Sequence, residues 1–362
     1  MMQFIVSNQT EPYWNIAVEN YLVETADAVT LYLWKNRRTV VIGQNQNPFS
    51  EVNVEALEAD GGYLMRRRTG GGAVYHDDGN LNFSFVVPKA LYDQQRQFSV
   101  IQRAVESFGL HTVLSGRNDI LVGCLPACGG NHGNPENRLN EISQDSFGPD
   151  KSLKSKENLQ DFQDFAKRET YMRKFSGNAF SKGRVNDLHH GTLLISGDMS
   201  DLARYLKPKP AKLQKHGVAS VRSRVVNLAE LNPAITAESI APRLRAAFEA
   251  EYGGMAAEVS FDSLMQLPAV RELHDHFASP EWKYGRWRTF TAQRSAQFDW
   301  GGVEVALDID DGVIRDVQIA SDALDLAALE AVRQKLTGAT IEAAPVLCDN
   351  PIEQDIYNLL FK

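Results

Sequence analysis

The stretch from Arg66 to Asp77 constrains this chain more than any other. It reads Arg-Arg-Arg-Thr-Gly-Gly-Gly-Ala-Val-Tyr-His-Asp, and an alternation of apolar residues at Leu81, Phe83 and Phe85 follows it. Consecutive glycines let backbone N–H groups turn inward without side-chain clashes, and such a turn can bind phosphate or carboxylate oxygens. Arginines supply positive charge and forked donors for the same oxygens. The stretch therefore predicts an anion-binding loop beside a strand, rather than a plain hairpin.

Composition limits the broad class of the protein. With 43% hydrophobic and 23% charged residues the chain resembles an ordinary soluble globular protein. Its 362 residues favour two domains over one. A formal net charge of −8 argues against broad nucleic-acid binding, so we expect anion binding to be local and no nucleic-acid partner.

Three further features bear on the cellular location. The sequence has no apolar run near the roughly 20 residues that a membrane span needs. Its first residues lack the basic start and apolar core of a secretory signal. The cysteines Cys124, Cys128 and Cys348 form no regularly spaced framework, which fits a reducing compartment. We therefore expect a cytoplasmic protein with no membrane partner.

Apolar periodicity predicts helices and strands in mixed order along the chain. Helices are expected over residues 14–22, 51–59, 98–108, 200–206, 236–252 and 323–336. Strands are expected over residues 31–34, 40–42, 63–65, 73–75, 81–87, 120–122, 303–309 and 313–319. Because strand–helix–strand alternation is irregular, the pattern favours an α+β fold. The glycine pair Gly253-Gly254 suggests domains over residues 1–252 and 255–362, and Asp310-Asp311-Gly312 predicts a hairpin in the second.

Several short motifs follow the glycine stretch in order. They are Arg117-Asn118-Asp119, Lys174-x-Ser176-Gly177-Asn178-Ala179, His189-His190-Gly191-Thr192-Leu193-Leu194 and Ser220-Val221-Arg222-Ser223-Arg224-Val225-x-Asn227-Leu228. Together with residues 66–77, this ordered set closely resembles the signature of lipoate–protein ligases of the A type. The resemblance covers residues 1 to about 250, and the remainder is similar to the small accessory domain of the longer ligases.

The resemblance implies both a fold and an activity. The fold would be a large sheet-based catalytic domain of the biotin/lipoate ligase type, followed by a small α+β accessory domain. The enzyme would use ATP to convert free lipoate to lipoyl-AMP, and would then transfer the lipoyl group to a lysine of an acceptor protein. The implied acceptors are the lipoyl domains of 2-oxoacid dehydrogenase complexes and the glycine-cleavage H protein.

The same resemblance implies roles for particular residues. The matching lysine, Lys174, would be the catalytic residue that contacts the lipoyl carboxylate and the α-phosphate. Asp119 is the implied Mg²⁺ ligand, since Mg²⁺ often uses one or two carboxylates together with substrate phosphates. The residues implied in binding ATP or lipoate are Arg67, Gly71, Gly72, Ala73, Val74, Tyr75, His76, Asn118, Asp119, Ser176, Gly177, Asn178, Ala179 and His190. Among these, Val74 and Tyr75 are expected to shape the acyl pocket.

Residues 123–172 separate two strands that the family joins by a short turn. They are rich in Gly, Asn, Ser, Asp and Lys with little periodicity, so we expect a flexible surface insertion with a short helix near residues 158–168. Cys124, Cys128 and His132 have the spacing of metal ligands, but no fourth ligand is evident, and zinc binding is disfavoured.

A basic segment lies downstream. Between Leu202 and Leu228 there are seven basic residues and no acidic one: Arg204, Lys207, Lys209, Lys212, Lys215, Arg222 and Arg224. The segment from Lys207 to Arg224 could attract acidic lipoyl domains, although Arg222 and Arg224 could instead be structural.

Three alternatives to a ligase remain open at this point. An ATP-independent lipoyl or octanoyl transferase of the same fold would need a cysteine nucleophile, and Cys124 is the only one near the motifs. A biotin ligase would carry a Gly-Arg-Gly-Arg-type loop where this chain has Arg-Thr-Gly-Gly-Gly. A catalytically silent binder of lipoyl proteins would result if the insertion disabled the active-site hairpin.

Overall fold

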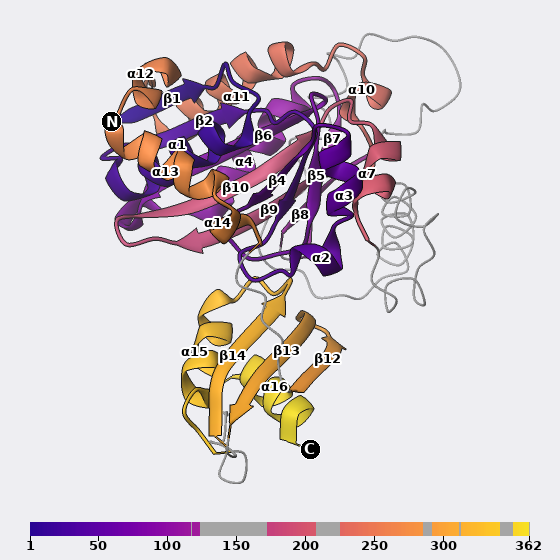
Figure 1. The fold of residues 1–362 in the computed structure, drawn as a ribbon. Coiled ribbons are helices and arrows are strands. Elements are labelled where there is room, and N and C mark those ends of the chain that lie inside the picture. Colours follow the sequence, from indigo (N-terminus) through magenta and orange to yellow (C-terminus); the bar gives the residue numbers. More distant parts are fainter. Residues whose placement is uncertain are drawn as a thin grey trace, which may run out of the picture.

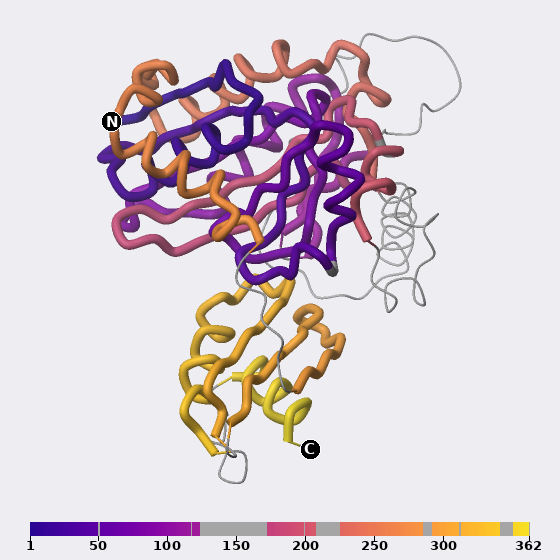
Figure 2. The backbone as a smooth tube through the Cα atoms, in the orientation of Figure 1, coloured from indigo at the N-terminus to yellow at the C-terminus, as the bar shows by residue number. Residues whose placement is uncertain are grey.

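The computed structural model describes residues 1–116, 118–123, 172–207, 225–284, 292–310, 313–340 and 350–361. Figures 1 and 2 show a large body that carries the N-terminus and a smaller body that carries the C-terminus. Among these residues no helix is both long and apolar enough to cross a membrane.

A mixed sheet of eight strands organises the large body (Figure 1). Its strand order is β11-β1-β2-β6-β10-β9-β8-β7, with β1 parallel to both of its neighbours and every other pair antiparallel. The strands are β1 (Met2–Val6), β2 (Val29–Trp34), β6 (Asn80–Pro88), β7 (His111–Ser115), β8 (Asp119–Gly123), β9 (Arg173–Lys182), β10 (Asn186–Leu194) and β11 (Ala257–Glu258).

The apolar alternation predicted after the glycine stretch forms β6 near the middle of this sheet. Leu81, Phe83 and Phe85 point into a core shared with helices α4 (Gln94–Glu106) and α11 (Ala237–Tyr252). The intervening residues Asn82 and Ser84 are polar but equally buried. Successive side chains of a strand point to opposite faces, so both faces of this sheet are covered.

The other face of the sheet packs against helices and a second, smaller sheet. Helix α1 (Pro12–Thr25) lies on it, with α12 (Phe261–Met265) and α13 (Pro268–Ala278) packed alongside. The second sheet has the order β4-β3-β5. Its strands are β3 (Thr39–Ile42), β4 (Tyr63–Arg66) and β5 (Val74–His76). The connection from β4 to β5, residues 67–73, contains the three glycines and is called the glycine loop below.

Short helices complete the large body. They are α2 (Pro48–Glu51), α3 (Val54–Ala59), η1 (Lys89–Leu91), α7 (Met199–Tyr205), α10 (Leu228–Leu231) and α14 (Pro280–Tyr284). The single helix expected over residues 51–59 is wrong in detail, because Val52 leaves the helical path to form a bridge with Leu206.

The domain boundary expected at Gly253-Gly254 does not coincide with the end of the large body. Gly253 ends α11 in the left-handed conformation, with a φ of 75°, as a helix stop should. Residues 257–258 nevertheless rejoin the large sheet beside β1, and α12 and α13 share the core of α1. The glycine pair therefore marks the end of a helix, and residues 255–284 pack with the first body.

The smaller body has its own hydrophobic core. It contains β12 (Ala292–Phe298), β13 (Gly301–Asp310), β14 (Val313–Ser321), α15 (Leu326–Leu336) and α16 (Pro351–Phe361). The antiparallel pairing of β13 with β14 confirms the predicted hairpin strands, whereas its turn, residues 311–312, lies outside the described residues.

The ends of the expected insertion are adjacent in space. Val122 of β8 lies opposite Arg173 of β9 in an antiparallel pair, although residues 124–171 between them are outside the described part of the chain. Directly opposed residues in such a pair are about 5 Å apart at Cα, so a two-residue turn can close the gap.

We therefore expect that replacing residues 124–171 by Asn-Gly preserves the fold. The melting temperature, followed by circular dichroism, should stay within about 3 °C of the full-length value, because the new loop is shorter and removes no described core contact. A soluble variant that melts more than about 8 °C lower would show that the segment stabilises the fold.

Candidate active site

A cavity of about 240 Å³ lies between the large sheet and the β4-β3-β5 sheet. The apolar part of its wall consists of Ile16, Trp34, Val41 and Met65. The remaining wall combines polar side chains with glycines and smaller apolar residues: Arg67, Gly71, Gly72, Ala73, Val74, His76, Asn82, Asn118, Lys174, Gly177, Asn178, Ala179, His190, Gly191 and Thr192. A concave site with an apolar wall and a few converging polar groups is typical of small-molecule binding.

Lys174 contributes an amine to this wall. Its Nζ lies 2.7 Å from Asp119 Oδ1, and the two side chains are 37% and 34% exposed. The side chain also lies over Gly177, where an added Cβ would be 3.0 Å from Nζ. In the pairing with β8, Ile120 lies opposite Ser176 and Leu121 opposite Lys174, so Phe175 is a bulged residue buried in the core. Bulges commonly redirect a side chain next to a functional site.

Arg67 holds the glycine loop from the inside. Its Nη2 donates to the carbonyls of Gly70 and Gly72 at 2.7 and 2.9 Å, and its Nε donates to Thr69 Oγ1 at 3.0 Å. Burial lowers the pKa of Arg67 to about 10, and the charge of Glu19 opposes that shift. The guanidinium therefore stays charged at neutral pH, and its donors shape the loop.

The other two arginines of the stretch lie elsewhere. Arg66 donates to backbone carbonyls on both sides of it, including Gln46 and Trp282. Arg68 stacks its guanidinium over the ring of Phe277. Only Arg67 of the three lines the described cavity.

The smaller body also touches the glycine loop. The N–H of Gly71 donates to the carbonyl of Ala323 at 3.2 Å, and Ser321 donates to the carbonyl of Asn45 at 2.9 Å. Gly71 has a φ of 95°, which strongly favours glycine. An anion that uses the Gly71 N–H would thus have to replace the Ala323 carbonyl.

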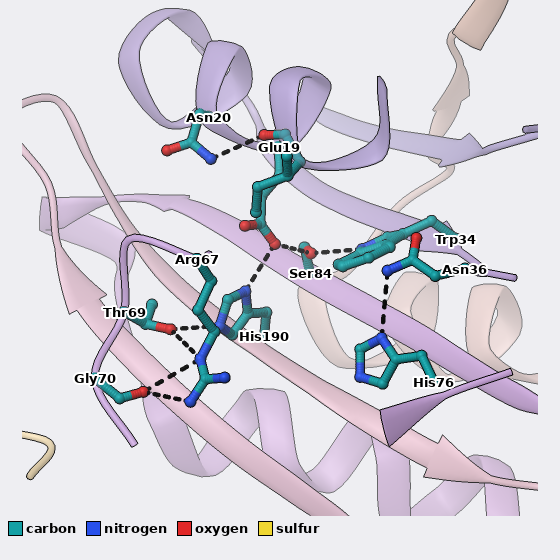
Figure 3. A network of polar contacts seen from close by, with 11 residues as sticks. Glu19, Asn20, Trp34, Asn36, Arg67, Thr69, Gly70, His76, Ser84 and His190 are labelled. Carbon is teal, nitrogen blue, oxygen red and sulfur yellow. Dashed lines mark hydrogen bonds and ion pairs between the residues drawn. The ribbon is translucent and has the colours of Figure 1, made fainter. Parts of the chain in front are cut away.

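A chain of buried hydrogen bonds supports the loop (Figure 3). Glu19 Oε2 accepts from Ser84 Oγ at 2.5 Å and lies 2.8 Å from His190 Nδ1. The other ring nitrogen of His190 lies 2.8 Å from Thr69 Oγ1, which in turn contacts Arg67. Glu19 is 1% exposed. Its negative charge thus balances the buried guanidinium through two intervening side chains.

His76 is buried in the part of the cavity wall that strand β5 provides. Burial and, secondarily, the charge of Arg67 lower the pKa of His76 to about 3, so its ring is neutral at physiological pH. Its Nδ1 lies 3.3 Å from the amide nitrogen of Asn36, and its ring is edge-on to Trp34 at 6.3 Å between centroids (Figure 3).

Most of the residues singled out from the sequence line this one cavity. Asp119 reaches it only through its ion pair with Lys174. Ser176 is 1% exposed and lies within 3.4 Å of Asn178 Nδ2, behind the wall. Tyr75 does not shape the described cavity, contrary to expectation. Because side chains alternate along β5, Val74 and His76 face the cavity while Tyr75 packs behind it and donates to Asp201.

Sequence reasoning missed part of the site. Glu19 lies on α1, and a single acidic residue on a helix gives no signal of burial. Trp34 and Met65 are predicted to lie in strands, and nothing in the sequence marks them as cavity residues. The sequence signal of Asn82 is misleading, because a polar residue between apolar ones usually faces solvent. The detectable signal is that the polar positions of β6 are asparagine and serine rather than charged residues.

Some expectations fall outside the described residues. These are Arg117, the possible metal ligands Cys124, Cys128 and His132, the helix near 158–168, and the basic segment beyond Lys207. Within the described ranges no group of three or more His, Cys, Asp or Glu side chains could hold a metal ion.

Comparison with known proteins identifies two family matches. The family described as lipoyl protein ligase A/B catalytic domain matches residues 11–249, and the family described as bacterial lipoate protein ligase C-terminus matches residues 288–352. A lipoate-protein ligase A of Psychrobacter cryohalolentis is 34% identical over 344 residues, which cover 92% of this chain and 87% of the relative.

Solved structures show the same fold. LipL1 of P. falciparum, in complex with lipoate, has a TM-score of 0.72 and 25% identity, over 95% of this chain and 92% of its own. A bipartite lipoate protein ligase of Thermoplasma acidophilum, studied with its E2 lipoyl domain, has a TM-score of 0.59 and 21% identity, over 80% and 98% of the two chains.

The buried position of Glu19 leads to a stability prediction. Glu19→Gln keeps the size of the side chain but leaves the Arg67 charge without its buried counterpart, so unfolding free energy should fall by about 3 kcal/mol. The measurement is the midpoint of urea unfolding, converted with the slope of the transition.

Glu24→Gln on the same helix is the matched control. Glu24 forms an ion pair with Arg184 at 3.5 Å and its side chain is 40% exposed, so its loss should cost about 0.5 kcal/mol or less. Equal effects of the two substitutions would contradict a special role for Glu19.

Proposed function

The chain belongs to the lipoate–protein ligase A family, and from that premise we propose that it converts free lipoate and ATP to lipoyl-AMP and then transfers the lipoyl group to an acceptor lysine. As a member of this family the protein is a ligase, and the individual steps are the proposal. The observation that carries them is a single cavity that has an apolar wall around Trp34 and Met65 and the amine of Lys174 at its polar wall.

Lys174 is the proposed catalytic residue. When the lipoate carboxylate attacks the α-phosphate of ATP, two negatively charged groups must approach each other. A positioned cation that contacts both groups lowers their repulsion and stabilises the negative charge that develops on the phosphate oxygens. The partly exposed ion pair of Lys174 with Asp119 can exchange partners at low cost, because exposed ion pairs contribute little.

The glycine loop is the proposed site for the nucleotide phosphates. Gly72 has open space around its Cβ position, which lets a ligand approach the backbone closely. Arg67 lies behind the loop, so its charge attracts phosphates while its donors remain on loop carbonyls. A relative's crystal structure, described as lipoate-protein ligase A bound with ATP, is similar to this chain in fold.

Asp119 is the proposed protein ligand for Mg²⁺. Its carboxylate lies at the polar side of the site, and one carboxylate together with nucleotide phosphates is a donor set that Mg²⁺ accepts. The ion would neutralise phosphate charge, while Asp119 and Lys174 would share the oxygens around it.

The acceptor is proposed to be a lipoyl domain. The Thermoplasma acidophilum ligase of similar fold is described together with its E2 lipoyl domain, and we extend this pairing to lipoyl domains of 2-oxoacid dehydrogenase complexes and the H protein of glycine cleavage. The basic segment from Lys207 to Arg224 remains the proposed docking surface, in a cytoplasmic setting.

Pyrophosphate release separates this proposal from its main alternative. A transferase of the same fold would use a cysteine and no ATP, and the described cavity wall includes no cysteine. With lipoate, ATP and Mg²⁺, a ligase releases pyrophosphate, and addition of an apo lipoyl domain yields a product heavier by one lipoyl group in mass spectrometry. Lipoyl transfer that does not require ATP would favour the transferase, and the absence of both reactions would favour a silent binder.

Replacing Lys174 by alanine should abolish adenylate formation in a folded protein. We expect pyrophosphate release to fall by about a thousandfold, because the cation that screens the two anions is lost. Lys182→Ala, at the other end of the same strand, is the control and should have wild-type activity. Near-normal release by Lys174→Ala would refute its assignment.

Gly72→Val tests the glycine loop without disturbing the fold. Nothing lies within 4 Å of a Cβ at Gly72, so stability should be unchanged, while ATP affinity should fall at least about tenfold because the side chain blocks close approach. Gly71→Ala is the contrasting variant, since its positive φ should also lower the melting temperature. Wild-type ATP affinity in Gly72→Val would show that the phosphates bind elsewhere.

A further inference from the structure

Two buried nitrogen donors in the cavity wall have no partner among the described residues. They are His76 Nε2 and Asn82 Nδ2, and their residues are 3% and 1% exposed. Both residues line the cavity, and both are next to Trp34, which pairs with Asn82 across the sheet. A buried donor without an acceptor is costly and calls for an explanation.

The hydrogen-bond network determines that His76 Nε2 carries a proton. Asn15 Nδ2 donates to Asn36 Oδ1, so the remaining amide group of Asn36 is the NH₂ that faces His76 Nδ1. Because that NH₂ can only donate, Nδ1 must accept. In a neutral imidazole the single proton then lies on Nε2, which makes Nε2 a donor.

The same reasoning applies to Asn82. Its Oδ1 accepts from Asn80 Nδ2 at 3.0 Å, which leaves the NH₂ group as the atom without a partner. Two buried N–H donors thus belong to residues that line the cavity beside Trp34.

The sheet sets the distance between Asn82 and Lys174. Asn82 lies on β6, directly opposite Thr192 of β10, and the next strand, β9, carries Gly177 with the Lys174 amine over it. Two strand spacings are about 10 Å. That length is comparable with a five-carbon acid chain that ends in a small ring.

We infer that His76 Nε2 and Asn82 Nδ2 bind the sulfur atoms of the dithiolane ring, and that they make the site selective for an acyl chain with acceptor atoms at its far end. The inference rests on the proposed function and adds a specificity determinant to it. Sulfur in such groups is a weak acceptor, and it also makes favourable contacts with aromatic rings such as Trp34. A purely hydrocarbon chain would leave both donors without a partner.

The test compares two acids of the same shape. Lipoate carries the dithiolane ring, and cyclopentylpentanoate carries a carbocyclic ring of five atoms on the same chain, without sulfur. Pyrophosphate release with ATP gives kcat/KM for each acid. We expect the wild-type protein to favour lipoate by about tenfold, since only lipoate offers acceptors to the two donors.

Variants then assign the preference to the donors. Asn82→Leu and His76→Phe each remove one donor and keep a similar side-chain size. Each should reduce the ratio of kcat/KM for lipoate to kcat/KM for the carbocyclic acid by about threefold or more. Part of this change should come from a higher kcat/KM for the carbocyclic acid. Tyr252→Phe is the control: it removes another buried polar group without a hydrogen-bond partner, outside the described cavity wall, and should leave the ratio unchanged.

The outcomes separate this inference from the proposed function. Equal use of both acids by the wild-type protein, or an unchanged ratio in both variants, would overturn the inference while pyrophosphate release upholds the ligase. Release with neither acid would overturn the proposed function and the inference with it.

Discussion

The buried charge of Arg67 is the constraint on which the rest of the site depends. A guanidinium removed from water is tolerated only when its N–H groups have acceptors and its charge is balanced. The glycine loop supplies the acceptors, because glycines let the carbonyls of Gly70 and Gly72 turn toward one side chain. Glu19 supplies the balancing charge through His190 and Thr69. The loop, helix α1 and strand β10 are therefore fixed together.

This arrangement explains why the large sheet is polar on a buried face. Asn82 and Ser84 occupy positions where a sheet under a helix usually carries aliphatic residues. Ser84 is satisfied by Glu19 and Trp34, as part of the network that supports the loop. Asn82 keeps an unpartnered donor in the cavity wall. A stable core would avoid such a group, so a binding role is the simpler physical explanation.

Local patterns in the sequence predict individual helices, strands and loops, but not which of them come into contact. The glycine loop, the alternation of β6 and the cap of α11 by Thr236 and Gly253 are each encoded within a few residues, so they were predictable. Glu19 and His190 lie 171 positions apart, and no local pattern shows that they meet. The prediction that Tyr75 shapes the cavity is wrong for a related reason. Alternation along a strand does not tell which of its two faces lines the cavity. The motifs that resemble the ligase family contain most of the residues of the cavity wall. A family signature can bring together residues that are distant in the chain, which the pattern of one sequence alone cannot do.

The hydrogen-bonded pair of Glu19 and His190 and the ion pair of Lys174 and Asp119 differ in the way that the proposed chemistry requires. Glu19 and His190 are almost fully buried, so breaking their hydrogen bond would leave two buried polar groups without their partners. Lys174 and Asp119 are both about one-third exposed, and water can replace either partner at small cost. The proposed adenylate formation needs a cation that can leave its carboxylate for the carboxylate and phosphate of the substrates, while the loop proposed to bind those phosphates stays in place. The structure therefore has its exchangeable pair at the open side of the cavity and its permanent pair behind the loop.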